Sequence, residues 1–117
     1  MTCAHERPVR RVEVEGDLTV YTAAAQKSRL LPALRAPYTL VELDLVQVCE
    51  IDTAGVQLLL LGCNIALMMG GALRLVNPSP AVRAVLELLM LDPVFARASE
   101  HCPTCAAQAV ATPGAGA

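Results

Sequence analysis

Tryptophan is absent from this chain of 117 residues, and aromatic residues of any kind make up only 3% of it. A hydrophobic core must therefore be built mainly from leucine, valine and alanine, because hydrophobic residues still account for 55% of the sequence. The length suits one domain with a single two-layer core and leaves no room for a second domain.

Histidine is also scarce, and the two in the chain, His5 and His101, lie near its ends and in no arrangement typical of catalysis. The sequence has no glycine-rich phosphate loop of the Walker or dinucleotide-binding type. Its net charge is −2, so the chain lacks the excess of positive charge that is typical of nucleic-acid-binding proteins. These absences predict a protein that is not an enzyme and that has neither a cofactor nor a nucleic-acid partner.

An export signal is missing as well, since charges and a proline occupy the start of the chain where an apolar segment should begin. The uncharged stretch 53–73 is long enough to cross a bilayer. However, Gln57, Asn64 and the pair Gly70-Gly71 interrupt it, so we expect no membrane insertion. These features predict a cytoplasmic protein.

Cysteine occurs five times, an odd number that argues against a disulfide framework in a chain without an export signal. Cys49 and Cys63 lie in apolar runs and are predicted to be small buried residues. His101, Cys102 and Cys105 form a short motif that could be a redox pair or half of a zinc site. A redox pair normally lies between a strand and a helix, and a zinc site needs further ligands; the motif has neither. Reduced thiols without a special role are therefore the preferred interpretation.

The alternation of apolar and charged residues over 11–15 predicts a strand with one buried face. Gly16 and Asp17 predict a turn from this strand into a second one. Later apolar segments that are bounded by turn residues are predicted to be strands as well. The predicted strands lie at 12–15, 18–21, 38–45, 73–76 and 94–96.

Three helices are predicted between these strands. The first runs from Ala23 to about Arg35 and is kinked or ended by Pro32. The second covers 54–69 and ends at Gly70-Gly71. The third begins with Ser79 as its cap ahead of Pro80, ends before Asp92-Pro93, and is expected to bury Val82, Val85, Leu86 and Leu89.

The helix predicted at 54–69 carries two apolar faces, although a surface helix needs only one. Two interpretations have equal weight: other helices flank it, or its second face contacts another protein chain. The first face holds Val56, Leu59, Leu60, Cys63 and Leu67, and the second holds Leu58, Leu61, Ile65, Met68 and Met69.

Strands that alternate with helices predict an α/β domain with one mixed sheet of four to five strands. We expect this domain at 9–98, after an N-terminal arm at 1–8 and before a flexible C-terminal tail at 99–117. The tail is rich in alanine, glycine and proline, a composition typical of frayed chain ends.

The segment Asp52-Thr53-Ala54-Gly55 lies between a predicted strand and the long helix. Aspartate and threonine are favoured at helix N-caps, where a side-chain oxygen accepts bonds from free backbone amides, and glycine allows close backbone approach. The start of a helix also favours a phosphate, so the hydroxyl of Thr53 could meet a partner and could carry a modification. Alone the segment is a weak signal, because most Asp-Thr pairs before a helix are only caps.

Four blocks of sequence strengthen that signal, namely 12–20, 42–45, 51–55 and 70–83. In their order and spacing they resemble the STAS domain family, which includes bacterial anti-sigma factor antagonists and the cytosolic tails of sulfate transporters. The resemblance covers about residues 9–95. It implies a STAS-like fold with the helices packed on one face of the sheet.

In that family the serine or threonine directly after the aspartate is the phosphoacceptor, which implies this role for Thr53. The resemblance also implies that Asp44 and Asp52 shape the loop around the hydroxyl. Asp17 and Asp44 are better explained as turn and cap residues than as a catalytic carboxylate pair. The predicted loop-shaping and partner-binding residues are Asp17, Asp44, Asp52, Ala54, Gly55, Leu58 and Leu61.

The resemblance implies a regulatory binding module. The unmodified protein would bind an anti-sigma factor that is also a serine/threonine kinase, and phosphorylation of Thr53 would end the contact. An alternative is the STAS subunit of bacterial phospholipid transporters, which the Asp-Thr-small-Gly segment also resembles and which binds the transporter ATPase. A thiol or metal protein that uses Cys102 and Cys105 is a distant third, and a second copy of the chain is a further candidate partner.

Overall fold

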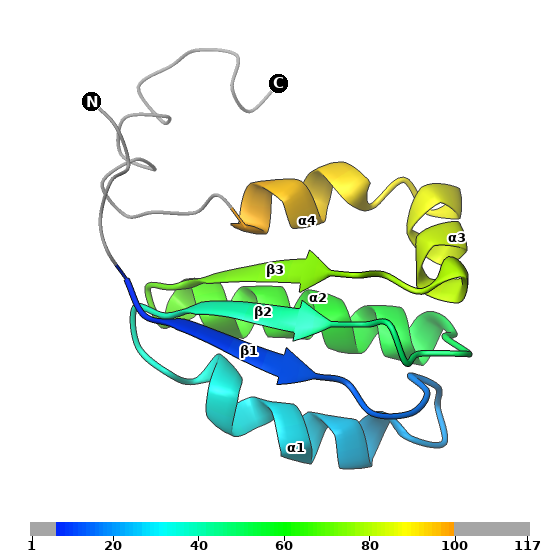
Figure 1. Ribbon diagram of the computed structural model, residues 1–117, viewed down its shortest axis with the longest axis horizontal. Coiled ribbons are helices and arrows are strands. Elements are labelled where there is room, and N and C mark those ends of the chain that lie inside the picture. Colours follow the sequence, from blue (N-terminus) through cyan, green and yellow to red (C-terminus); the bar gives the residue numbers. More distant parts are fainter. Residues whose placement is uncertain (1–6, 100–117) are drawn as a thin grey trace.

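Three parallel strands form the sheet in the computed structural model, which describes residues 7–99 (Figure 1). They are β1 (Val9–Glu13), β2 (Leu40–Asp44) and β3 (Ala72–Val76), in the order β1-β2-β3. Val12 is level with Leu43, and Leu43 with Leu75, so these apolar side chains share one face of the sheet. Because the strands are parallel, all three carboxyl ends lie at the same edge.

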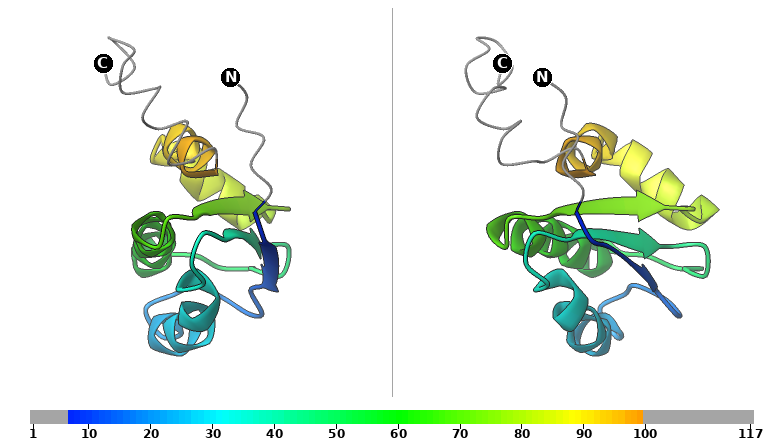
Figure 2. Two further views of the ribbon diagram at one scale, coloured as in Figure 1. Left: turned by 90° about the vertical axis from the view of Figure 1, so that its left-hand side faces the viewer. Right: turned by 60° about the vertical axis from the view of Figure 1, so that its left-hand side comes forward.

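Two helices cover the apolar face, α1 (Ala23–Leu34) and α2 (Thr53–Met68) (Figure 2). The core between them and the sheet is aliphatic, as the composition predicts, with Leu30, Leu43 and Leu59 at most 1% exposed. The opposite face is polar: Arg11, Glu42 and Arg74 are level with one another across the three strands. Arg74 pairs with Glu42 at 3.3 Å.

Two shorter helices, α3 (Pro80–Leu88) and α4 (Asp92–Ser99), lie on the β3 side of the sheet (Figures 1 and 2). Ser79 caps α3, because its hydroxyl accepts a bond from the amide of Val82 at 3.2 Å, and Pro80 follows at the first helical position. In α4, Phe95 is only 5% exposed and anchors the helix to the core.

The predicted α/β class is confirmed, but the sheet differs from the prediction. Within residues 7–99 it has three strands rather than four or five, and it is parallel rather than mixed. Residues 18–21 do not form a strand: only Leu18 bridges to Ile51. The hydroxyl of Thr22 accepts the amide of Thr19 at 2.9 Å and donates to the carbonyl of Asp17 at 2.7 Å, which closes the segment into a turn.

The strand predicted at 94–96 is also wrong, because this segment belongs to α4. α3 ends at Leu88, before Asp92-Pro93 as predicted, but Asp92 and Pro93 begin a new helix, where a proline in the first turn is tolerated. In α3 itself, Val82 and Leu86 are buried as predicted, whereas Leu89 is 44% exposed.

The second apolar face of α2 divides into buried and exposed parts. Leu58 is 7% exposed and belongs to the core, so its placement on a partner-binding surface is wrong. The reason is that α2 is flanked by α1, β3 and α4, which widens its buried stripe. Leu61 is 36% exposed and Met68 is 84% exposed.

Cys63 is buried as predicted, and burial raises the pKa of its thiol to about 12. Cys49 is exposed, which contradicts the prediction, because it lies in the loop between β2 and α2 rather than in an element. His101, Cys102 and Cys105, with most of the predicted arm and tail, lie outside the described residues. Among residues 7–99 no helix has both the length and the apolar character needed to cross a membrane.

Candidate functional site

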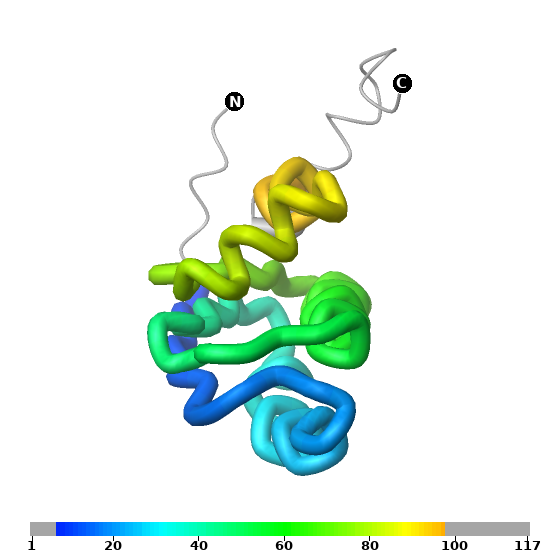
Figure 3. The backbone as a smooth tube through the Cα atoms, turned by 90° about the vertical axis from the view of Figure 1, so that its right-hand side faces the viewer, coloured from blue at the N-terminus to red at the C-terminus, as the bar shows by residue number. Residues whose placement is uncertain are grey.

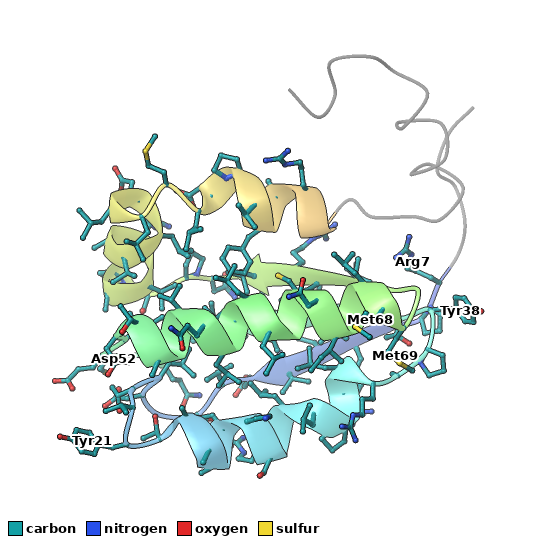
Figure 4. The ribbon with its side chains drawn as sticks, turned by 180° about the vertical axis from the view of Figure 1, so that it is seen from behind. Arg7, Tyr21, Tyr38, Asp52, Met68 and Met69 are labelled. Atoms are coloured by element: carbon teal, nitrogen blue, oxygen red, sulfur yellow. The ribbon has the colours of Figure 1, made fainter. Side chains whose placement is uncertain are left out.

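The predicted acceptor segment lies at the edge of the sheet where the three strands end. The N-terminus of α2 meets the loop 14–22 and the beginning of α3 at this edge, with the segment 45–52 between them (Figure 3). In open sheets of parallel strands this edge is where binding sites commonly form. Figure 4 shows Asp52 and Tyr21 together at this end of the domain and Tyr38, Met68 and Met69 at the other.

Asp52 is the N-cap of α2 and also holds the neighbouring loop. Its Oδ1 accepts bonds from the amides of Ala54 at 2.9 Å and Gly55 at 3.2 Å, which satisfies two of the free N–H groups of the helix start. Its Oδ2 accepts the amide of Val20 at 2.9 Å. One carboxylate therefore fastens the loop 17–22 to the helix.

These bonds lower the pKa of Asp52. The amide of Val20 is the largest cause, the amides of Gly55 and Ala54 add to it, and partial desolvation acts in the opposite direction. Since the pKa in the folded state lies below the ordinary 3.8, the contribution of Asp52 to stability is fully present above that value and is lost as the pH falls through the lowered pKa.

We therefore expect the amide resonances of Val20, Ala54 and Gly55 to shift together during an acid titration followed by NMR. Their common midpoint should lie below 3.8, because the three amides report the same carboxylate. The Asp52→Asn variant is the control and should abolish this shared transition. A midpoint at or above 3.8 in the unmodified protein would show that the fastening bonds are absent.

Asp17 fastens a second pair of segments. Its Oδ1 accepts the amides of Cys49 at 3.2 Å and Glu50 at 3.1 Å. Main-chain bonds run alongside, from the amide of Leu18 to the carbonyl of Glu50 at 2.9 Å and from the amide of Asp52 to the carbonyl of Leu18 at 3.1 Å. The loop that begins at Asp17 is thus bound to the chain on both sides of Ile51.

Gly55 makes this attachment sterically possible. A Cβ atom built at Gly55 would lie 2.1 Å from the carbonyl oxygen of Leu18 and 2.7 Å from its Cβ, well inside contact distance. Any side chain would therefore push the loop away from α2. The glycine of the Asp-Thr-Ala-Gly segment is explained by this close approach.

Thr53 is the first residue of α2, and its side chain is exposed. Its hydroxyl makes no hydrogen bond within residues 7–99, since Asp52 takes the capping role. Ala54 is partly buried beside it. The hydroxyl of Thr53 is therefore accessible without local unfolding.

Asp44 lies at the end of β2, and its carboxylate makes no hydrogen bond to the residues around Thr53. Its carboxylate accepts bonds from Arg11 at 3.0 Å, from the amide of Val46 at 3.0 Å and from Asn77 at 3.2 Å. The amide of Val46, then the guanidinium of Arg11, lower its pKa. Asp44 thus fixes the start of the loop 45–52 and ties β2 to the end of β3.

A groove of about 410 Å³ opens beside Asp52. Apolar side chains and two carboxylates line it, and neither lysine nor arginine does. The groove was missed by the sequence analysis, because it forms only where the turn carrying the 94%-exposed Tyr21 approaches α3. Its lining residues are Thr19, Tyr21, Glu50, Ile51, Asp52, Ala81 and Val85.

The chemistry of this edge suits contact with a macromolecule. Over residues 7–99 no group of three or more histidine, cysteine or acidic residues is arranged to hold a metal ion. Asp17 and Asp52 are each occupied by backbone amides. What remains for a partner is an exposed hydroxyl, an apolar groove and the carboxylate of Glu50.

Comparisons with known proteins agree with this description. A family model described as "Mlab, STAS domain" matches residues 1–96. Among solved structures, a candidate anti-sigma factor antagonist from Thermotoga maritima superposes with a TM-score of 0.63 and 23% sequence identity over 74% of each chain, which shows a shared fold. A search of curated proteins gives no match. On the strength of the family model, the chain belongs to the STAS domain family.

Proposed function

We propose that this STAS domain is a regulatory protein-binding module, similar in action to an anti-sigma factor antagonist. Its partner docks on the surface around Thr53, and phosphorylation of Thr53 by a partner serine/threonine kinase ends the contact. The observation that carries the proposal is the position of Thr53. Its hydroxyl is exposed at the first residue of α2, on a helix start that Asp52 and Gly55 hold rigidly in place.

A phosphate at this position would be tolerated by the domain and would oppose docking. The N-terminus of α2 favours negative charge, and its first turn contains no acidic residue. However, phosphate adds nearly two charges beside the carboxylates of Asp52 and Glu50 on the same surface. A partner that buries this surface would have to desolvate the phosphate and both carboxylates. The modification would therefore weaken partner binding without unfolding the protein.

Incubation with the partner kinase and ATP should phosphorylate Thr53 and no other hydroxyl. Two serines serve as internal controls: Ser28 is exposed on α1, whereas Ser79 is 5% exposed and caps α3.

We expect Thr53→Glu to weaken partner binding about tenfold or more and Thr53→Ala to change it only about two- to threefold, measured by titration calorimetry. Neither variant should lower stability greatly, because Asp52 remains the N-cap. Phosphorylation confined to Ser28 would refute the assignment.

A second candidate is an accessory subunit that binds the ATPase of a phospholipid-type ABC transporter. It is favoured by Asp52-Thr53-Ala54-Gly55, which resembles the STAS subunit of those transporters, and in particular by Ala54, where many anti-sigma factor antagonists carry a second hydroxyl. The same variants separate the two functions. If Thr53→Ala weakens binding as much as Thr53→Glu, the unmodified hydroxyl is the contact and the transporter function is preferred. Capture of the bound protein and its mass spectrum then identify the partner as a kinase or an ATPase.

A further inference from the structure

The domain carries opposite charges at its two ends. At the edge where the strands end, segments 13–17 and 44–52 contain six acidic residues and no basic one. At the edge where the strands begin, segments 7–10, 35–40 and 67–72 contain three arginines and no acidic residue. We call these last three segments the basic end. Its charge is opposite to that of the candidate functional site.

Main-chain hydrogen bonds join the three segments of the basic end into one surface. The amide of Leu40 donates to the carbonyl of Pro8 at 2.9 Å, and the amide of Tyr38 donates to that of Met69 at 3.0 Å. Arg7 lies at the same end of the domain as Tyr38 and Met69 (Figure 4). Residues from three distant parts of the sequence therefore act at one place.

Apolar side chains and positive charges are exposed together at the basic end. Val9, Tyr38 and Met68 are 58%, 67% and 84% exposed. Arg10 and Arg35 are exposed as well, and within residues 7–99 neither of these two forms an ion pair. The basic end thus presents unpaired positive charge beside apolar side chains that the core does not cover.

The backbone holds Tyr38 at this surface. Its φ is 56°, in the left-handed region that is unfavourable for a residue with a side chain, and such a conformation persists only where the surrounding structure enforces it. The ring lies against Gly70, where an added Cβ would be 2.9 Å from two of the ring carbons. Gly70 therefore leaves the space that the ring needs, and the phenol is fixed in an exposed position.

We propose that the basic end docks on the surface of a membrane that contains anionic lipids, without crossing it. Arg10 and Arg35 contact the phosphate groups of the lipids. Tyr38 lies in the interface, because its ring is apolar and its hydroxyl is polar. Met68 and Val9 reach the boundary of the acyl chains, where their apolar surface leaves water.

The mixture of charge and apolar surface is the reason to choose a lipid surface over another occupant. A folded protein would have to provide an acidic group opposite each arginine, whereas a layer of anionic headgroups provides negative charge wherever the arginines lie. A nucleic acid would neutralise the arginines but would offer Val9 and Met68 no apolar environment. Only the lipid surface uses both properties without a fixed pattern of contacts.

The acidic end does not prevent this docking. Helix α2 separates Met68 from Thr53 by about 22 Å, at a rise of 1.5 Å per residue. This is well beyond the Debye length of about 8 Å at physiological salt, so repulsion between the acidic end and the lipids is largely screened. Docking through the basic end would also leave Thr53 directed away from the membrane and open to a partner. We expect weak binding, half-maximal on the order of 1 mM accessible lipid.

Cosedimentation of the full chain with vesicles tests the proposal. The protein should bind vesicles made of equal parts phosphatidylserine and phosphatidylcholine, should not bind phosphatidylcholine alone, and should be released by high salt. Arg35→Glu and Met68→Glu should each weaken binding about tenfold or more. Arg83→Glu is the matched control, since Arg83 is also exposed and outside any ion pair of residues 7–99 but lies on α3. It should leave binding unchanged, and circular dichroism checks that all variants are folded.

The absence of tryptophan allows the orientation to be measured. In Tyr38→Trp the new indole should shift its emission to the blue on anionic vesicles and should be quenched by brominated lipid chains. Tyr21→Trp places the same probe at the acidic end, where Tyr21 is 94% exposed, and should show neither change.

Four results would overturn the proposal. The first is a protein that does not bind the anionic vesicles. The second is an Arg83→Glu variant that binds as poorly as Arg35→Glu, which would show a response to net charge alone. The third is a Tyr21→Trp signal as large as that of Tyr38→Trp, which would place the wrong end on the lipids. The fourth is a protein that ignores vesicles but loses a bound protein or nucleic acid through Arg35→Glu, which would assign the basic end to that partner.

Discussion

Gly55→Ala should destabilise the domain by about 2 kcal/mol or more, because the added methyl group would overlap the backbone of Leu18. The carbonyl oxygen of Leu18 cannot move by itself: it accepts the amide of Asp52, and the adjoining loop is held through Asp17. We therefore expect the whole segment 17–22 to detach from the start of α2. Urea denaturation would report the loss of stability.

Gly62→Ala is the matched control in the same helix. A Cβ at Gly62 would meet the side chain of Leu34 at 3.5 Å, an ordinary contact distance. Alanine is also preferred over glycine inside a helix by about 0.5–1 kcal/mol, so this variant should be neutral or slightly more stable. Equal destabilisation by the two substitutions would show that the close approach at Gly55 has no special role.

Leu58→Glu should unfold the domain, whereas Leu61→Glu should leave it folded. Leu58 is 7% exposed within the core, and an unpaired carboxylate there should cost about 4 kcal/mol or more, a large part of the stability of a small domain. Leu61 lies three residues away but is 36% exposed, so its substitution should change stability by about 0.5 kcal/mol or less. Thermal unfolding followed by circular dichroism distinguishes the two.

The same pair of variants tests the part of the partner surface predicted on α2. If Leu61→Glu keeps the fold but weakens the binding of a partner, Leu61 belongs to that surface. Met68 is a less suitable probe, since it lies at the other end of α2, about 22 Å from Thr53 at 1.5 Å per residue. Unfolding by Leu61→Glu as severe as that by Leu58→Glu would place Leu61 in the core.

Features with a local signal were predictable from the sequence. Asp52 and Ser79 were expected as helix caps, and both accept amides of their own first turns. Gly70 was expected to end α2, and it adopts a positive φ of 79° directly after the helix. In each case the residue and its bonding partners lie within a few positions of one another, so no knowledge of the tertiary structure is needed.

The errors concern features that depend on distant parts of the chain. Helical periodicity showed two apolar faces on α2, but only the positions of α1, β3 and α4 determine that Leu58 is inside. The apolar character of 18–21 suggested a strand, whereas the hydroxyl of Thr22 and the attachment to Ile51 impose a turn. The groove beside Asp52 joins residues from three separate segments, and no spacing in the sequence brings Tyr21 next to Val85.

The rigid attachment around Asp52 has a consequence for any enzyme that modifies Thr53. Many kinases bind their substrates as extended peptides, but the backbone around Thr53 is already hydrogen-bonded. Thr53 begins a helix, the amide of Ala54 after it donates to the carboxylate of Asp52, and the amide of Asp52 before it donates to the carbonyl of Leu18. Such an enzyme must therefore accept a folded surface, made of the helix start, the turn at Val20 and the groove beside α3. Its selectivity would be determined by three-dimensional shape rather than by a short consensus motif, and so it would be as narrow as that of a protein–protein complex.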